Sequence, residues 1–227
     1  MSNMLACNYP SIYRRHYSKD DEEDWSDWKN TDKRLGELSG ILPLGRTYLN
    51  SAMHDSWVIS YSKTSTAISI SLNDFQSHCF CHAFAARIGV SNGYGASDCT
   101  VAFCFSGVHR LAVCHVNRNG KLLPLHTDRF LPLLETWLAD DPSLLSPNRI
   151  RLGILFWTKR KVKKSNELFL ELEAEQLDFR EHQREVFLRL FGEEHLKWFD
   201  LYMETRQKME WYFDYSGSIE FLLKNDL

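Results

Sequence analysis

Residues 57–72 read WVISYSKTSTAISISL, and this segment decides the fold. In its first half, Trp57, Ile59 and Tyr61 share one face of an extended chain, whereas Val58 lies on the other. Its second half alternates isoleucine and leucine with serine, the period-two pattern of a strand with one buried face. The polar residues between the halves can turn the chain. The segment therefore predicts an antiparallel hairpin with one apolar face.

The rest of the chain continues with hairpins and interspersed helices. Apolar residues recur at helical spacing near residues 74–88, 129–139 and 180–207, which predicts three helical regions. Asn73 or Asp74 can cap the first helix and Gly89 can end it. Alternating or apolar runs predict further strands at residues 100–105, 110–116, 121–125, 149–158 and 167–175.

Adjacent hairpins with interspersed helices favour the α+β class over a doubly wound parallel sheet. We expect one domain over residues 1–227, with an antiparallel sheet built from hairpins and covered by the three helical regions. The domain begins with a polar lead-in (about 1–25), which is followed by a short helix ending near Gly36 or Gly40. A helical C-terminal segment (about 180–215) completes it.

The composition is that of an ordinary globular protein, with 44% hydrophobic and 25% charged residues among 227. A net charge of −3 gives no electrostatic footprint for nucleic acid or for an anionic membrane. No apolar run reaches the roughly 18–20 residues that span a bilayer, and the first residues lack the apolar core of a signal peptide. We therefore expect a cytoplasmic protein whose six cysteines are reduced and mostly buried.

Three polar residues, His54, Asp55 and Ser56, stand directly before the hairpin. Asp or Ser at the start of a strand can accept a backbone N–H and fix a turn. Histidine can instead titrate near neutral pH, and aspartate commonly orients it. The triplet is therefore a turn-forming element or a binding site. No third group gives it a reaction, and no catalytic residue is predicted.

The cluster His78-Cys79-Phe80-Cys81-His82 is the densest group of potential metal ligands. On a helix, His78 and His82 lie one turn apart and could share a metal ion. A zinc site needs further ligands, usually from a second paired module, and no such module follows. A structural role is favoured, so neither a metal nor a cofactor is expected. The hydrolase motifs G-x-S-x-G and H-E-x-x-H are also absent from the sequence.

Two acidic stretches could contact a basic partner. Residues 20–27 read DDEEDWSD, and Glu171, Glu173 and Glu175 alternate along a predicted strand. A solvated surface is the favoured interpretation of both. The glutamate row could also face cationic neighbours across its hairpin, whose other strand ends in Lys159-Arg160-Lys161. An acidic segment that contains tryptophan can still dock a protein partner with a basic surface.

The stretch MHDSWVIS (residues 53–60), followed by the alternating hairpin, is similar to a strand opening found in several uncharacterised bacterial families. In these families a hydrophobic residue precedes His-Asp-Ala or His-Asp-Ser. Some are domains of unknown function, and others resemble immunity proteins of polymorphic toxin systems. The resemblance covers residues 53–73 and carries over to His54, Asp55 and Ser56.

These observations together predict a non-enzymatic, cytoplasmic bacterial protein that binds a protein partner and resembles an immunity protein. One alternative is a small-ligand-binding protein or enzyme with a pocket around His54 and Asp55. A second alternative is a metal-binding protein that uses His78 and His82. The sequence leaves the oligomeric state open.

Overall fold

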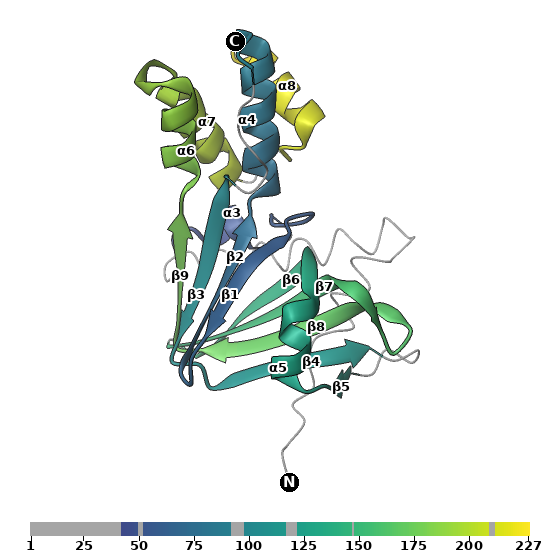
Figure 1. Ribbon diagram of the computed structural model, residues 1–227. Coiled ribbons are helices and arrows are strands. Elements are labelled where there is room, and N and C mark those ends of the chain that lie inside the picture. Colours follow the sequence, from purple (N-terminus) through teal and green to yellow (C-terminus); the bar gives the residue numbers. More distant parts are fainter. Residues whose placement is uncertain (1–41, 50–51, 92–97, 117–121, 147, 209–211) are drawn as a thin grey trace, which may run out of the picture.

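The computed structural model describes residues 42–49, 52–91, 98–116, 122–146, 148–208 and 212–227. Two antiparallel sheets and a group of helices form an α+β fold, as the sequence predicts (Figure 1). The four-stranded sheet has the order β1-β2-β3-β9, with β1 Val58–Lys63, β2 Ala67–Asn73, β3 Thr100–Ser106 and β9 Gln176–Glu181. The five-stranded sheet has the order β5-β4-β8-β7-β6, with β5 Leu122–Pro124, β4 Arg110–Val116, β8 Ser165–Ala174, β7 Arg149–Val162 and β6 Leu134–Ser146.

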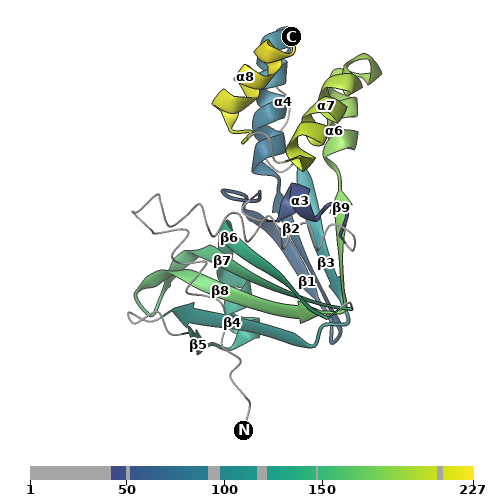
Figure 2. The ribbon, with the colours of Figure 1, turned by 180° about the vertical axis from the view of Figure 1, so that it is seen from behind.

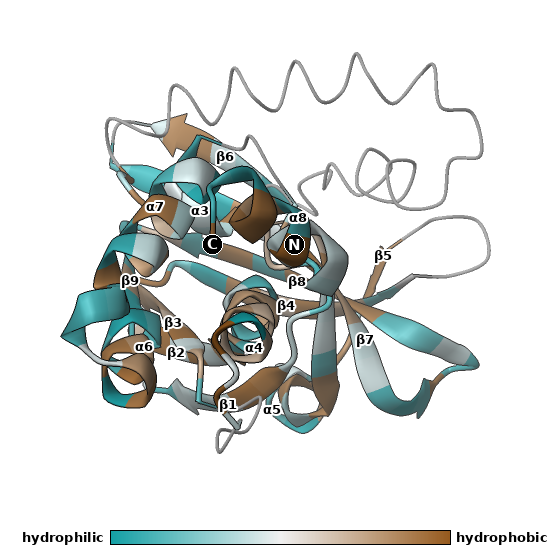
Figure 3. Ribbon diagram, turned by 90° about the horizontal axis from the view of Figure 1, so that it is seen from above, coloured by the Kyte–Doolittle hydropathy of each residue, from teal (hydrophilic) through white to brown (hydrophobic). Residues whose placement is uncertain are grey.

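The larger helices gather at one end of the four-stranded sheet rather than across its face (Figures 1 and 2). The helices are α3 Gly45–Tyr48, α4 Phe75–Ile88, α5 Thr127–Phe130, α6 Gln183–Phe191, α7 Leu196–Gln207 and α8 Tyr215–Lys224. This placement follows from the connections, because β2 continues almost directly into α4 and β9 into α6. Figure 3 shows α4 with α6, α7 and α8 around it.

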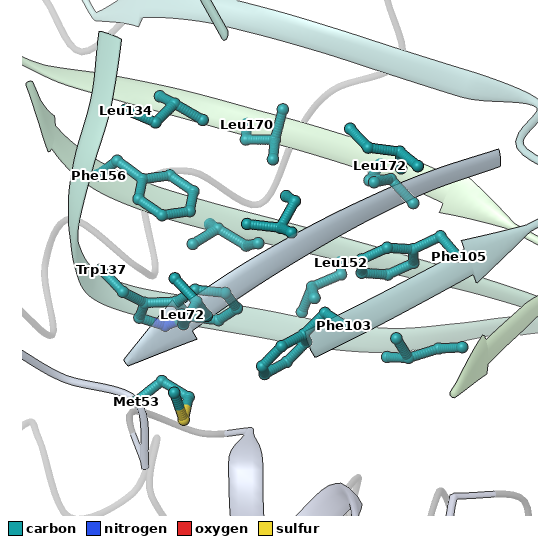
Figure 4. Packing of buried hydrophobic residues seen from close by; sticks show 14 of the residues in the cluster. Met53, Leu72, Phe103, Phe105, Leu134, Trp137, Leu152, Phe156, Leu170 and Leu172 are labelled. Carbon is teal, nitrogen blue, oxygen red and sulfur yellow. The ribbon is translucent and has the colours of Figure 1, made fainter. Parts of the chain in front are cut away.

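The main hydrophobic core lies between the two sheets (Figure 4). Phe103 of β3 packs against Trp137 of β6 with ring centroids 5.0 Å apart, and Trp137 meets Phe156 of β7 at 5.5 Å. A second core lies among the helices, where Phe80 of α4 stacks on Tyr202 of α7 at 4.2 Å. Aromatic rings thus join the sheets to one another and the helices to one another.

Most of the predicted local elements are confirmed. The hairpin of β1 and β2 forms, and α4 begins after the Asp74 cap and ends at Gly89, which has a φ of 72°. The predicted strands correspond to β3, β4, β5, β7 and β8, and β5 returns beside β4. The predicted face of Val58 is wrong, because an irregularity between Val58 and Ser60 shifts the register. Val58 therefore packs against the main core.

The predicted helix at residues 129–139 is wrong beyond its first turns. Helix α5 and the 3₁₀ helix Leu131–Leu133 are followed by the long strand β6. Pro132 lacks an N–H and does not continue an α-helix. Register shifts between Leu134 and Thr136, and between Trp137 and Ala139, break the period of two. The irregular strand consequently has a helix-like spacing of apolar residues.

The C-terminal region contains more elements than predicted. The segment expected as a helix at residues 180–207 begins with the end of β9 and is then divided into α6, the 3₁₀ helix Glu193–His195 and α7. Gly192, with a φ of 84°, separates the two longer helices. Helix α8, which the sequence does not predict, follows with Ser216 and Gly217 in its first turn. The expected helix near Gly36 and Gly40 lies outside the described residues.

Among the described residues, no helix has both the length and the apolar character needed to cross a membrane.

Candidate functional site

The His54-Asp55-Ser56 triplet lies where the two sheets meet. The Asp55 N–H donates to the Trp137 carbonyl at 3.0 Å, and the Trp137 N–H donates to the Ser56 carbonyl at 2.7 Å. Trp57 then forms a single antiparallel bridge with Thr136. The backbone of the triplet therefore joins the start of β1 to β6.

The three side chains of the triplet have different surroundings. Ser56 is buried, and its hydroxyl oxygen accepts the Phe75 N–H at 3.3 Å at the start of α4. His54 Nδ1 lies 3.1 Å from Asp55 Oδ2, and these side chains are 34% and 49% exposed. Ser56 thus has a structural partner, whereas His54 and Asp55 form a pair at the surface. Asp55 also has a φ of 66°, a conformation uncommon outside glycine.

The histidines considered as metal ligands both lie on α4, with ring centroids 6.4 Å apart. Burial lowers the pKa of His78, and His82 lowers it further, while Asp98 acts in the opposite direction. His82 packs edge-on against Tyr215 of α8 at 5.1 Å. Across the described part of the chain, no three His, Cys, Asp or Glu side chains are grouped so that they could hold a metal ion.

A buried polar network surrounds the N-terminal cap of α4. Asp74 Oδ2 accepts hydrogen bonds from Ser77 Oγ at 2.7 Å, from Gln183 Nε2 at 2.9 Å and from Arg206 Nη1 at 2.5 Å. Its other carboxylate oxygen accepts the Ser77 N–H at 3.3 Å. Asp74 has no exposed surface and Arg206 only 3%. One carboxylate thereby ties α4 to α6 and α7.

The network extends through tyrosines on two further elements. Arg206 Nη1 donates to the Tyr202 hydroxyl at 3.1 Å, and the guanidinium lies over the Tyr48 ring, 5.2 Å from its centroid. The Tyr48 hydroxyl donates to Glu181, and Gln183 Nε2 donates to Tyr48 at 3.1 Å. These contacts add α3 and β9 to the set of elements that the network holds together.

Asp74 and Arg206 are both charged at neutral pH. Burial alone raises the pKa of Asp74, but Arg206 and the hydrogen bonds outweigh it, so the pKa lies below its ordinary value. Burial and the nearby Asp74 raise the pKa of Tyr48. Burial also raises the pKa of Tyr202. A carboxylate with so many donors has little capacity to act as a base, so the network is a structural element.

Only one partner of the central ion pair, Asp74, can be identified from the sequence. Asp74 can be identified as a possible helix cap, because a short polar side chain precedes an apolar helical pattern. No sequence pattern identifies Arg206 as the partner of Asp74. It lies 132 positions further along the chain, in helix α7, which contains several other charged and polar residues. Their pairing depends on how α7 packs against α4.

The acidic row of β8 is not a solvated surface. Glu171 and Glu173 are buried, whereas Glu175 is exposed. Glu171 pairs with Arg110 at 2.8 Å, and Glu173 pairs with Arg151 at 2.8 Å. The expectation of cationic neighbours is right, but the cations are arginines of β4 and β7 rather than the run at residues 159–161. The two buried glutamates are therefore unavailable to a basic partner.

Among the strands that the structure describes, β1 is the edge strand of its sheet, and its edge away from β2 is free of any partner strand in this part of the chain. Thr64 N–H donates to the Ala67 carbonyl at 2.9 Å, which marks a hydrogen-bonded pair at the turn. Since such pairs alternate along an antiparallel ladder, Ser62 also bonds to β2, while the backbone groups of Tyr61 and Lys63 point away from it. The Ile59 and Tyr61 side chains are 41% and 40% exposed.

A pocket of about 290 Å³ lies on the face of the four-stranded sheet that carries the small side chains Ser69 and Cys104. Ser62, Ser69 and Cys104 contribute to its lining, and Asp178 and Arg180 of β9 complete its polar part. Neither His54 nor Asp55 lines it. The pocket expected around His54 and Asp55 therefore receives no support from this cavity.

No model of a known protein family matches the chain, and a search of curated proteins finds no relative of it.

Proposed function

We propose that the protein is a non-enzymatic binding domain that takes up an extended segment of a partner protein along the free edge of β1. The observation that carries this proposal is the exposure of that edge, at Ile59 and Tyr61 and at the outward backbone groups of Tyr61 and Lys63. Unpaired N–H and C=O groups on an edge strand pair readily with another strand. Many peptide-binding domains recognise extended segments in this way.

The surroundings of β1 favour a single extended segment over a whole folded subunit. Trp57 is tied to Thr136 of β6 at the beginning of the strand. Lys63 Nζ lies 2.5 Å from Asp128 of α5 at its end. A second copy of the chain that approached edge-on would have to pass α5 and β6, whereas one extended chain is narrow enough to lie between the two ends.

The partner is proposed to carry a basic surface near the segment that it inserts. The acidic run at residues 20–27 and the net charge of −3 support this choice, because opposite charges steer two proteins together. The resemblance at residues 53–73 supports a cytoplasmic bacterial protein of the immunity type. In such a protein, the bound segment belongs to the protein that is neutralised.

Replacing Tyr61 with proline tests the use of the β1 edge. Proline at position 61 removes the N–H that points away from β2 and keeps the hydrogen bonds between β1 and β2. Edge strands tolerate proline at such a position. We expect Tyr61→Pro to fold and to lose partner capture at least about tenfold, since one backbone hydrogen bond and its neighbours are lost. The matched variant Tyr61→Ser keeps the N–H and should capture more of the partner than Tyr61→Pro does. Circular dichroism establishes folding, and quantitative mass spectrometry measures capture.

Hydrogen exchange on the captured complex separates strand addition from other docking. The Tyr61 and Lys63 amides are expected to gain protection when the partner binds, whereas the Ser62 amide is already protected by β2. A partner that binds Tyr61→Pro as well as it binds the unmodified protein contradicts the proposal. Unchanged exchange at Tyr61 and Lys63 contradicts it as well.

A second candidate function, binding of a small anionic ligand at His54 and Asp55, is favoured by the positive φ of Asp55. Uncommon backbone conformations often accompany binding sites. The test is a nuclear magnetic resonance titration that follows the backbone amides of residues 54–56 with acetate and inorganic phosphate. Saturable shifts that vanish in His54→Gln support this candidate. Shifts that never saturate, or that are unaltered in His54→Gln, remove it in favour of a turn-forming role.

A further inference from the structure

Two buried thiols lie in contact between α4 and the start of β3. Cys81 Sγ of α4 is 3.9 Å from Cys99 Sγ, which directly precedes β3. Both side chains are fully buried in the helical core, beside Phe80 and Phe84. The backbone there is held as well, because the Cys99 carbonyl accepts the Asp74 N–H at 2.7 Å. The two sulfurs are thus kept near each other by the fold.

We propose that Cys81 and Cys99 form a reversible disulfide, so that the pair is an oxidation site for low-molecular-weight disulfides. A disulfide bond is about 2.05 Å long, so the sulfurs must approach each other by roughly 2 Å, which side-chain rotation can supply. The bond would close a loop between positions 18 apart in sequence and would tie α4 to β3. This inference is independent of the binding proposed for β1.

The oxidation of Cys81 and Cys99 consists of two successive thiol–disulfide exchanges. One protein thiolate attacks the small disulfide, forms a mixed disulfide and releases one small thiolate, which takes up a proton. The second protein thiolate attacks the protein sulfur of the mixed disulfide, and a second small thiol leaves. The two cysteines lose two protons and two electrons, and the small disulfide is reduced to two thiols.

The other described cysteines are poorly suited to this reaction. Among the described residues, the Cys81 and Cys99 sulfurs are in contact with each other, whereas no second cysteine sulfur lies within contact distance of Cys79 or Cys114. The Cys104 sulfur contacts the Ser69 hydroxyl at 3.5 Å rather than a second thiol. Cys79 and Cys114 therefore serve as internal controls for any non-specific oxidation.

Oxidised glutathione is the probe, applied to the folded, fully reduced chain. We expect a loss of about 2 Da, for two hydrogen atoms, and a peptide pair that joins Cys81 to Cys99 after digestion in acid. Because both thiols are buried, the reaction should be slow and should accelerate at low urea concentration. Closing a loop of this length should raise Tm by about 5–10 °C, and dithiothreitol should reverse the change.

The variant Cys99→Ala should lose both the linked peptide and the rise in Tm, whereas Cys114→Ala should keep both. If Cys99→Ala does not fold, peptide mapping of the unmodified protein decides the question alone. Two results overturn the proposal: glutathione adducts that remain while Cys81 and Cys99 stay reduced, or a Cys81–Cys99 linkage that forms only in denatured protein.

Discussion

Replacing Arg206 with methionine is expected to lower the free energy of unfolding by about 3–5 kcal/mol at neutral pH, the cost of breaking a buried ion pair. The variant removes the Arg206 guanidinium from Asp74, with which it forms a 2.5 Å contact among fully buried groups. The Asp74 carboxylate would then be a buried charge with only neutral donors. Urea unfolding followed by circular dichroism measures the change.

The pH dependence of stability should change sign at this position. In the unmodified protein the pKa of Asp74 lies below its ordinary value of 3.8, so its contribution is present above that pH and is lost as the pH falls through the folded pKa. Without Arg206, we expect burial, the largest influence on this group, to raise the pKa of Asp74 above its ordinary value. The variant is then penalised most at neutral pH, and the difference between the two proteins shrinks as the pH falls toward about 4.

Two further variants isolate the cause. Asp74→Asn combined with Arg206→Met removes the buried charge but keeps an oxygen that can cap α4. We expect this double variant to be more stable at neutral pH than Arg206→Met alone and to lose the altered pH dependence. Arg184→Met breaks the exposed pair with Asp200 and should leave stability unchanged. An equal loss in Arg184→Met and Arg206→Met would show that the buried network has no special role.

The elements that the sequence predicts well are those with local causes. The β1–β2 hairpin follows from the alternation of apolar and polar residues, which is interrupted only near Val58, and α4 follows from its spacing, the Asp74 cap and Gly89. The strand β6 is missed because its register shifts give it a helical spacing. The division of the sheets is missed too, since it depends on which edge strands pair and on where their pairing stops.

The candidate sites, like the helices and strands, could be predicted only where their causes are local in the sequence. The position of His54, Asp55 and Ser56 at the start of a strand could be predicted, because the hairpin beside them is a local pattern. Their contact with β6 could not, since Trp137 itself is expected in a helix. The free edge of β1 is likewise a property of the sheet order, which alternation does not determine.

Replacing Trp137 with alanine should destabilise the protein by about 3–5 kcal/mol, the usual cost of removing a large buried aromatic side chain. Trp137 has no exposed surface and packs against Phe103 and Phe156, one from each sheet (Figure 4). Its loss would leave a cavity where the sheets meet. The matched variant is Trp157→Ala, because Trp157 lies on β7 with 44% of its surface exposed and should cost about 1 kcal/mol or less.

The position of Trp137 also makes a local effect expected. Its backbone carbonyl accepts the Asp55 N–H, and its N–H donates to the Ser56 carbonyl, so a shift of the Trp137 backbone after loss of the ring would disturb the segment that leads into β1. In Trp137→Ala the Asp55 amide should exchange faster than in the unmodified protein, whereas in Trp157→Ala it should not change. Equal exchange at Asp55 in all three proteins would mean that the triplet is held without the ring. Faster exchange confined to Trp137→Ala would mean that core packing between the sheets positions the free edge of β1.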